Sequence, residues 1–111
     1  MHAVCSLDPA ARESTLRELK AFAARLCRDL EVEAVYVFGS FARGEEHEGS
    51  DIDLLVVGNL PGRAFDQIGE ILRRTELPVE PIVVSRATFE RRRAAGHPLF
   101  SRIAAEAIQL A

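Results

Sequence analysis

The sequence predicts an α/β (α+β) domain in which a small mixed sheet is flanked by helices. Short β-branched and aromatic runs alternate along the chain with segments whose apolar residues recur at helical spacing. The chain has 111 residues, of which 48% are hydrophobic and 28% charged. A chain of this size and composition holds one core, so we expect a single domain over residues 1–111.

The first predicted elements are a long helix and a short strand. Asp8 followed by Pro9 is typical of a helix start, and leucines and a phenylalanine then recur at helical spacing up to about residue 30. Residues 34–38 (Ala-Val-Tyr-Val-Phe) form a β-branched and aromatic run that stops at Gly39. This run predicts a strand that leads into a turn.

A second strand is expected over residues 52–57, beginning near Asp51. This run is almost wholly apolar, as in a strand covered on both faces. It is separated from the first strand by a short helix over 40–44 and a polar loop over 45–50. The connection is short for a parallel crossover, so the two strands are predicted to be antiparallel.

The rest of the chain predicts three helices around a third strand. The expected elements are a turn over 58–62, a helix over 63–75 with Phe65, Ile68, Ile71 and Leu72 at helical spacing, a strand over 79–84, a helix capped by Ser85 that runs through 93, and a last helix from Pro98 with Leu110 on its apolar stripe.

Charge, cysteine spacing and hydropathy bear on three possibilities: a nucleic-acid partner, a cysteine metal site and a membrane span. The net charge of −3 does not favour a nucleic-acid partner, although it leaves one open. Cys5 and Cys27 are far apart and have no metal-ligand spacing, so neither is expected to be a ligand. The sequence has no signal-peptide pattern and no apolar run near 18 residues. We therefore expect a cytoplasmic protein without a membrane span.

Asp51 and Asp53 are the residues most indicative of chemistry. A strand has a period of two, so both side chains point to one side with their α-carbons roughly 6.5 Å apart. Two neighbouring carboxylates repel each other unless a cation or several donors lie between them. Carboxylate oxygens are ligands that Mg²⁺ prefers, together with phosphate oxygens and water. The pair therefore predicts a magnesium site.

Gly39 and Ser40 predict a phosphate-binding turn. They follow a strand and precede a short helix, where glycine allows close approach of an anion and the first N–H groups of the helix point towards it. The serine hydroxyl adds a donor. A Gly-Ser pair alone is a common turn, so the prediction depends on the acids that follow.

The stretch from Val37 to Val57 resembles the signature of the nucleotidyltransferase superfamily related to DNA polymerase beta, and specifically its minimal single-domain members, the MNT proteins. Gly39, Ser40, Asp51 and Asp53 fall on the motif positions. The resemblance implies a polymerase beta-like fold. It also implies Mg²⁺-dependent transfer of a nucleoside monophosphate from a nucleoside triphosphate, with ATP as the default substrate.

The resemblance further implies a third carboxylate, which corresponds to Glu80. Asp51 and Asp53 would bind two Mg²⁺ ions, and Glu80 would assist the one that activates the acceptor hydroxyl or act as general base.

Two further residues are interpreted from their own chemistry. Arg43 is interpreted as a triphosphate contact, with a solvated surface arginine as the equal alternative. Pro81 removes a backbone donor and indicates that the third strand is an edge strand.

The partner expectations also come from the resemblance. Minimal members are paired with a small helical HEPN protein, and the transferase acts as the antitoxin by adenylylating that partner. Because larger relatives add a domain that binds the acceptor, we expect a partner to complete the site. The alternatives are a non-catalytic antitoxin that masks its partner by binding, and an α/β domain with incidental acids. The acceptor, the preferred base and any homo-oligomer stay open.

Overall fold

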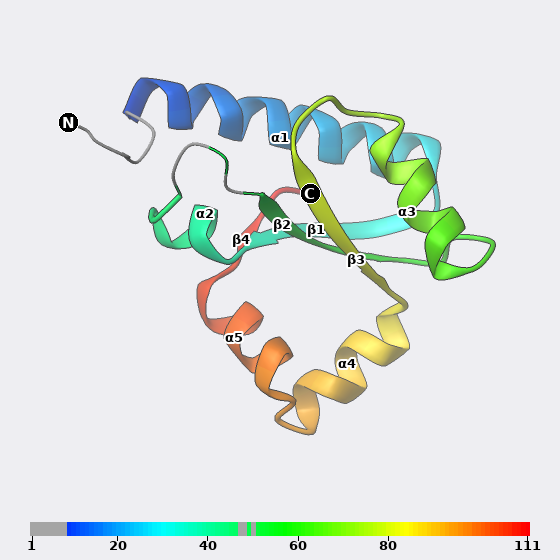
Figure 1. Cartoon of the computed structure of the whole chain (residues 1–111). Coiled ribbons are helices and arrows are strands. Elements are labelled where there is room, and N and C mark those ends of the chain that lie inside the picture. Colours follow the sequence, from blue (N-terminus) through cyan, green and yellow to red (C-terminus); the bar gives the residue numbers. More distant parts are fainter. Residues whose placement is uncertain (1–8, 47–48, 50) are drawn as a thin grey trace.

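A computed structural model describes residues 9–46, 49 and 51–111, and it contains a four-stranded sheet with helices on both faces (Figure 1). The predicted cap Asp8, Cys5 and part of the predicted loop over 45–50 lie outside the described residues. In chain order the elements are α1 (Pro9–Asp29), β1 (Val32–Phe38), α2 (Ser40–Arg43), β2 (Ile52–Gly58), α3 (Ala64–Leu72), β3 (Val79–Val84), α4 (Arg86–Ala94), α5 (Pro98–Glu106) and β4 (Ile108–Gln109).

The sheet is mixed and has the strand order β3-β2-β1-β4. β1 and β2 are antiparallel, as the short connection between them predicts. β2 and β3 are parallel and are joined through α3, because a parallel pair needs a long crossover. β3 is an edge strand, as Pro81 indicates. The predicted fold class is therefore confirmed.

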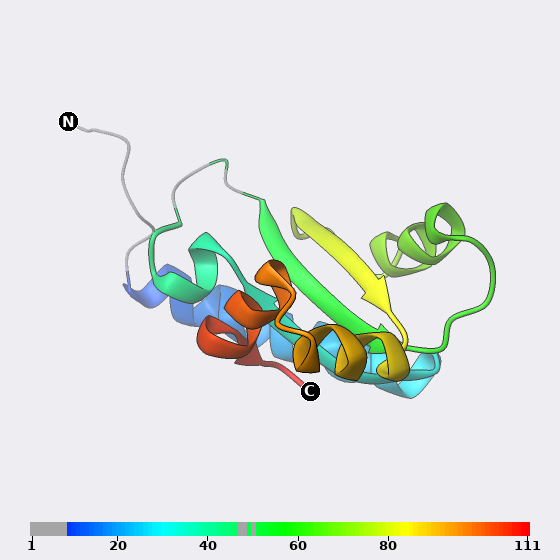
Figure 2. The same ribbon diagram turned by 90° about the horizontal axis from the view of Figure 1, so that it is seen from below.

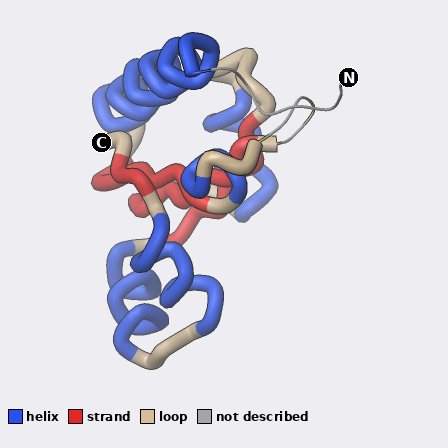
Figure 3. The backbone as a smooth tube through the Cα atoms, turned by 90° about the vertical axis from the view of Figure 1, so that its left-hand side faces the viewer, coloured by secondary structure: helices blue, strands red, loops and turns tan. Residues whose placement is uncertain are grey.

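Helices lie on both sides of the sheet (Figure 3), and each face of the sheet has its own cluster of buried apolar residues, where the size of the chain predicts a single core. Along β2, Leu54 and Val56 belong to the core beneath α1 and α3, whereas Leu55 and Val57 belong to the core beneath α4 and α5. This alternation follows from the period of two in a strand. It explains why β2 has an almost continuous apolar sequence.

The C-terminal end differs from the prediction. Instead of a helix that carries Leu110, α5 ends at Glu106 and the chain continues as β4. Ala107 takes an extended conformation with φ −69° and ψ 149°. The N–H of Leu110 then donates to the carbonyl oxygen of Val35 at 2.7 Å. The backbone of residues 108–110 thus forms hydrogen bonds with the open edge of β1, which it could not form as a further helical turn. Leu110 is buried, although it lies outside a helix.

The apolar residues of α3 do not all face the core. Ile71 is fully buried, whereas Phe65 is 87% exposed and Leu72 is 43% exposed. The helix is also shorter than predicted, since it ends at Leu72. Helical spacing therefore predicts the helix correctly without showing which of its apolar side chains are covered.

A buried ion pair anchors the segment after α2 to α1. The Glu46 side chain is 5% exposed and accepts hydrogen bonds at 2.7 and 2.8 Å from Nη1 of Arg12. The Arg12 guanidinium also lies 4.6 Å from the ring centroid of the buried Phe41 in α2. One arginine from α1 thus contacts both Phe41 of α2 and Glu46.

Replacing the buried apolar residue of α3 should destabilise the fold far more than replacing the exposed one. Ile71→Ala removes a fully buried side chain and should cost about 2–4 kcal/mol of unfolding free energy. The matched control Phe65→Ala should change it by less than about 0.5 kcal/mol. Urea denaturation measures both values, and similar losses in the two variants would contradict the described packing of α3.

Removing Glu46 should destabilise the protein because it leaves the Arg12 guanidinium partly buried without its acceptor. We expect Glu46→Ala to lower the unfolding free energy by about 1–3 kcal/mol, since one partner of a buried pair is lost. Asp29→Ala, which removes an exposed pair with Arg28, is the control and should have no measurable effect. Equal thermal shifts for both variants would show that the Arg12 contact has no special role.

Candidate active site

Three acidic residues lie at one end of the sheet, where β2 and β3 begin. Asp51 directly precedes β2 and is exposed, and Asp53 is the second residue of that strand. Glu80 is the second residue of β3 and pairs in register with Asp53. Residues in register on neighbouring strands point to the same face of a sheet. Asp53 and Glu80 therefore share the face on which α4 and α5 pack.

The turn at Gly39 packs directly against Asp53. Phe38, the last residue of β1, pairs with Asp53 in the antiparallel ladder, so the next residue passes over its side chain. Gly39 is buried and has φ 75° and ψ −151°, a region that is essentially restricted to glycine. A Cβ at this position would collide with Oδ2 of Asp53 and lie 3.2 Å from its Cγ. The structure thus brings the glycine turn and one of the acids together.

The acids form an uncompensated negative patch. Burial raises the pKa of the Asp53 carboxyl, the charge of Asp51 raises it further, and the charge of Arg43 opposes both. Within residues 9–46, 49 and 51–111, none of the carboxylates of Asp51, Asp53 and Glu80 has a hydrogen bond or an ion pair. A cation at this position would offset the effects of burial and of Asp51 on the Asp53 carboxylate.

The three carboxylates are not arranged around a common metal position in the described part of the chain. Among the described residues, no group of three His, Cys, Asp or Glu side chains is arranged to hold a metal ion. Asp51 and Asp53 nevertheless fit Mg²⁺, because they offer hard oxygen atoms that have no hydrogen-bond or ion-pair partner among the described residues. Glu80 is connected with them by its register on β3 alone.

The two remaining predicted site residues, Ser40 and Arg43, are the first and last residues of α2. Ser40 begins the helix, is half-buried, and its hydroxyl has no partner in the part of the chain that the structure describes. Arg43 ends the helix and is tied to two carboxylates. Its Nε donates to Glu45 at 2.9 Å, and its Nη1 donates to both carboxylate oxygens of Glu106 at 3.2 Å. Arg43 is therefore an exposed side chain, 40% accessible, that is held by two ion pairs.

Glu106 is a residue of this region that sequence reasoning missed. It comes from the end of α5, 63 residues from Arg43 in the sequence, and α2 and α5 lie side by side near the start of β2 (Figure 2). No motif or spacing connects the two positions. Only the fold brings them together.

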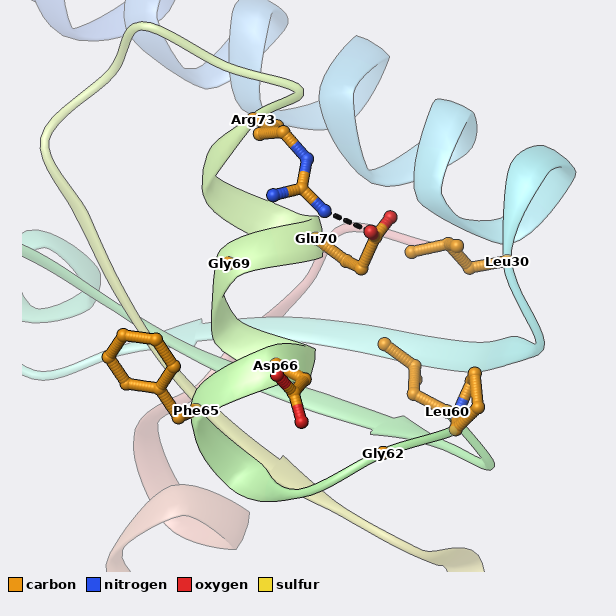
Figure 4. Close-up of a pocket in the computed structure, with 9 residues that line it drawn as sticks. Leu30, Leu60, Gly62, Phe65, Asp66, Gly69, Glu70 and Arg73 are labelled. Carbon is orange, nitrogen blue, oxygen red and sulfur yellow. Dashed lines mark hydrogen bonds and ion pairs between the residues drawn. The ribbon is translucent and has the colours of Figure 1, made fainter.

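A cleft of about 410 Å³ lies at the other end of β2 and is separate from these acids. Figure 4 shows it between α3 and the chain that leaves β2, with the Arg73–Glu70 ion pair at its edge. Its lining residues are Leu30, Leu60, Pro61, Gly62, Phe65, Asp66, Gly69, Glu70 and Arg73. None of the predicted site residues is among them.

Three solved structures share this architecture. A candidate nucleotidyltransferase from Sulfolobus solfataricus is 28% identical, with a TM-score of 0.61 over 74% of this chain and 77% of that one. A toxin–antitoxin solved with AMP-PNP is 21% identical, with a TM-score of 0.58. A mutant of the toxin–antitoxin MntA–HpeT is 18% identical, with a TM-score of 0.57. The last two each cover 83% of this chain and 72% of theirs, and at these identities they show the fold alone.

Sequence comparisons agree with the structural ones. A candidate protein adenylyltransferase of Methanocaldococcus jannaschii, MJ1215, is 41% identical over 49 residues, which span 40% of this chain and 57% of that protein. No helix of the described residues has the length and apolar character that a bilayer span requires. The family model described as a nucleotidyltransferase domain matches residues 19–111, and the chain belongs to that family.

Proposed function

We propose that the protein transfers AMP from ATP, with Mg²⁺, to a hydroxyl group of a partner protein. The observation that supports this best is the packing of Gly39 against Asp53 beside two further unpaired acids. This arrangement places carboxylates next to a backbone turn that has no side chain. A metal–triphosphate complex needs both features, since its cations require carboxylates and its phosphates require close backbone approach.

Each residue has a distinct role in this proposal. Asp51 and Asp53 hold Mg²⁺, and Glu80 serves as a third ligand or accepts the proton of the attacking hydroxyl. Gly39 lets the phosphate chain approach the backbone, and the Ser40 hydroxyl donates a hydrogen bond to it. When bound, the ions supply charge that neutralises the triphosphate and lowers the pKa of the acceptor hydroxyl.

The acceptor and the biological role are inferred from relatives. The similarity to a candidate protein adenylyltransferase supports a protein acceptor, and the fold shared with a toxin–antitoxin solved with AMP-PNP supports an adenine nucleotide. We propose that the chain acts as the MNT antitoxin of a toxin–antitoxin pair in the cytoplasm. Its partner in this proposal is a small helical HEPN-type toxin, whose hydroxyl receives the AMP.

The proposal is tested by incubating the protein and the product of the neighbouring gene with each labelled nucleoside triphosphate and Mg²⁺. We expect the mass of the partner to rise in steps of one AMP, and EDTA should prevent the increase. A stable complex with the partner that shows no added mass under any condition would instead support the non-catalytic antitoxin. The observation that favours this second function is that, in the described part of the chain, no three carboxylates are already arranged around one point.

Asp53→Asn should remove transfer without harming the fold. We expect a loss on the order of 10²–10³-fold in rate, because the charge that binds the metal is gone. Burial and Asp51 disfavour ionised Asp53 in the folded state, so the melting temperature should stay equal or rise near neutral pH. Asp29→Asn, on the exposed end of α1, is the control and should transfer normally. Near-full activity of Asp53→Asn at saturating Mg²⁺ and nucleotide would refute the assigned role.

Gly39→Ala should also impair transfer, because the new methyl group would displace the Asp53 carboxylate. Gly44→Ala is a matched control: it ends the same helix with the same φ of 75°, but nothing lies within 4 Å of the added Cβ. Gly44→Ala should therefore lose only about 1–2 kcal/mol of stability from its left-handed backbone. Rates of AMP transfer and melting curves separate the two effects, and equal rates in both variants would argue against the role of the turn.

A further inference from the structure

The Arg43–Glu106 pair connects the candidate site to the C-terminal end of the chain. Arg43 is the last residue of α2, the short helix that begins directly after Gly39, and its Nη1 is held by both oxygens of Glu106. The two residues lie on different helices, α2 and α5. The contact therefore fixes an arginine of the site from an element outside the nucleotidyltransferase motif.

Glu106 is itself held firmly in place. Its side chain is only 17% exposed. It is the last residue of α5, where the helix dipole disfavours a negative charge. Two residues later, Ile108 pairs with Val37 of β1, the strand that leads into Gly39. The carboxylate is thus anchored to the strand that carries the phosphate-binding turn, and Arg43 offsets its unfavourable position.

The two acceptors on Arg43 differ in what they contribute. Glu45 is a close sequence neighbour of Arg43 with a 64% exposed side chain, whereas Glu106 is mostly buried. Together they occupy Nε and Nη1 of the guanidinium. The described residues provide no acceptor for Nη2, which keeps two N–H donors available. An arginine fixed on one side and open on the other loses less side-chain entropy when it binds a phosphate.

We propose that Glu106 is a positioning residue that holds Arg43 ready for the polyphosphate of the nucleotide. Glu106 makes no contact with the substrate in this proposal and acts only through the guanidinium. The inference rests on the proposed function, since it assumes that a triphosphate binds at Gly39 and Ser40. It adds a specific requirement, namely that nucleotide affinity depends on a carboxylate at the end of α5.

The test measures the affinity for α,β-methylene-ATP with Mg²⁺ by isothermal titration calorimetry on the full chain. The methylene group prevents cleavage between the α and β phosphates, so binding is measured without transfer. Glu106→Ala should raise the Kd roughly two- to five-fold, the range expected from one partly exposed ion pair. Glu106→Gln should recover most of the affinity, because its amide oxygen still accepts from Nη1.

Two controls distinguish positioning from a general effect. Glu33→Ala breaks the Arg86–Glu33 pair, which also joins two separate elements, here through Nε of Arg86 at 2.8 Å. This pair involves none of the site residues, so the variant should leave the Kd unchanged. In an Arg43→Ala background, Glu106→Ala should cause no further change, because its effect passes through Arg43.

Several outcomes would overturn the inference. Tighter binding in both Glu106 variants would mean that the carboxylate competes with phosphate for Arg43. An unchanged Kd with a lower melting temperature would mean that Glu106 has a purely structural role. Additive losses of affinity in the double variant would mean that Glu106 does not act through Arg43. If the unmodified protein binds no nucleotide, the proposed function fails as well. If it binds and Asp53→Asn weakens binding while Glu106→Ala does not, only the inference fails.

Discussion

The close approach of the Gly39 backbone to the Asp53 carboxylate is the constraint on which the site depends. The antiparallel register of β1 and β2 places Phe38 opposite Asp53, so the turn that follows β1 has to cross that side chain. Only a residue without a Cβ fits there, and its backbone conformation is one that other residues rarely adopt. Register, turn and acid therefore form one unit, and none of the three can change alone.

The surrounding fold tolerates a patch of unpaired charge because its stability comes from elsewhere. Two apolar cores, one on each face of the sheet, bury all of β2 beyond Asp53. The Arg12–Glu46 pair fastens Glu46, which follows α2, to α1. Repulsion between Asp51 and Asp53 is thus confined to the first residues of a strand whose remainder is firmly packed.

The sequence predicts those features that repeat locally. The alternation in β2, the helical spacing in α1 and the order from Gly39 to Asp53 each lie within one segment, so the α/β class and the antiparallel first pair follow from them. β4 has two residues and therefore no period to detect. Glu106 meets Arg43 across 63 residues, and Phe65 follows the helical period of α3 while facing solvent. These features depend on tertiary packing, which no local pattern contains.

The C-terminal end of the chain contains the contacts near the candidate site that no local sequence pattern predicts. β4 pairs with β1, whose end leads into Gly39, and Glu106 immediately precedes β4 while binding Arg43 from α2. The turn and the arginine thus share one support, and a shift of α5 would move Arg43 relative to Gly39. The motif supplies the chemical groups, but the distance between its glycine turn and its arginine is set by residues that the motif does not include.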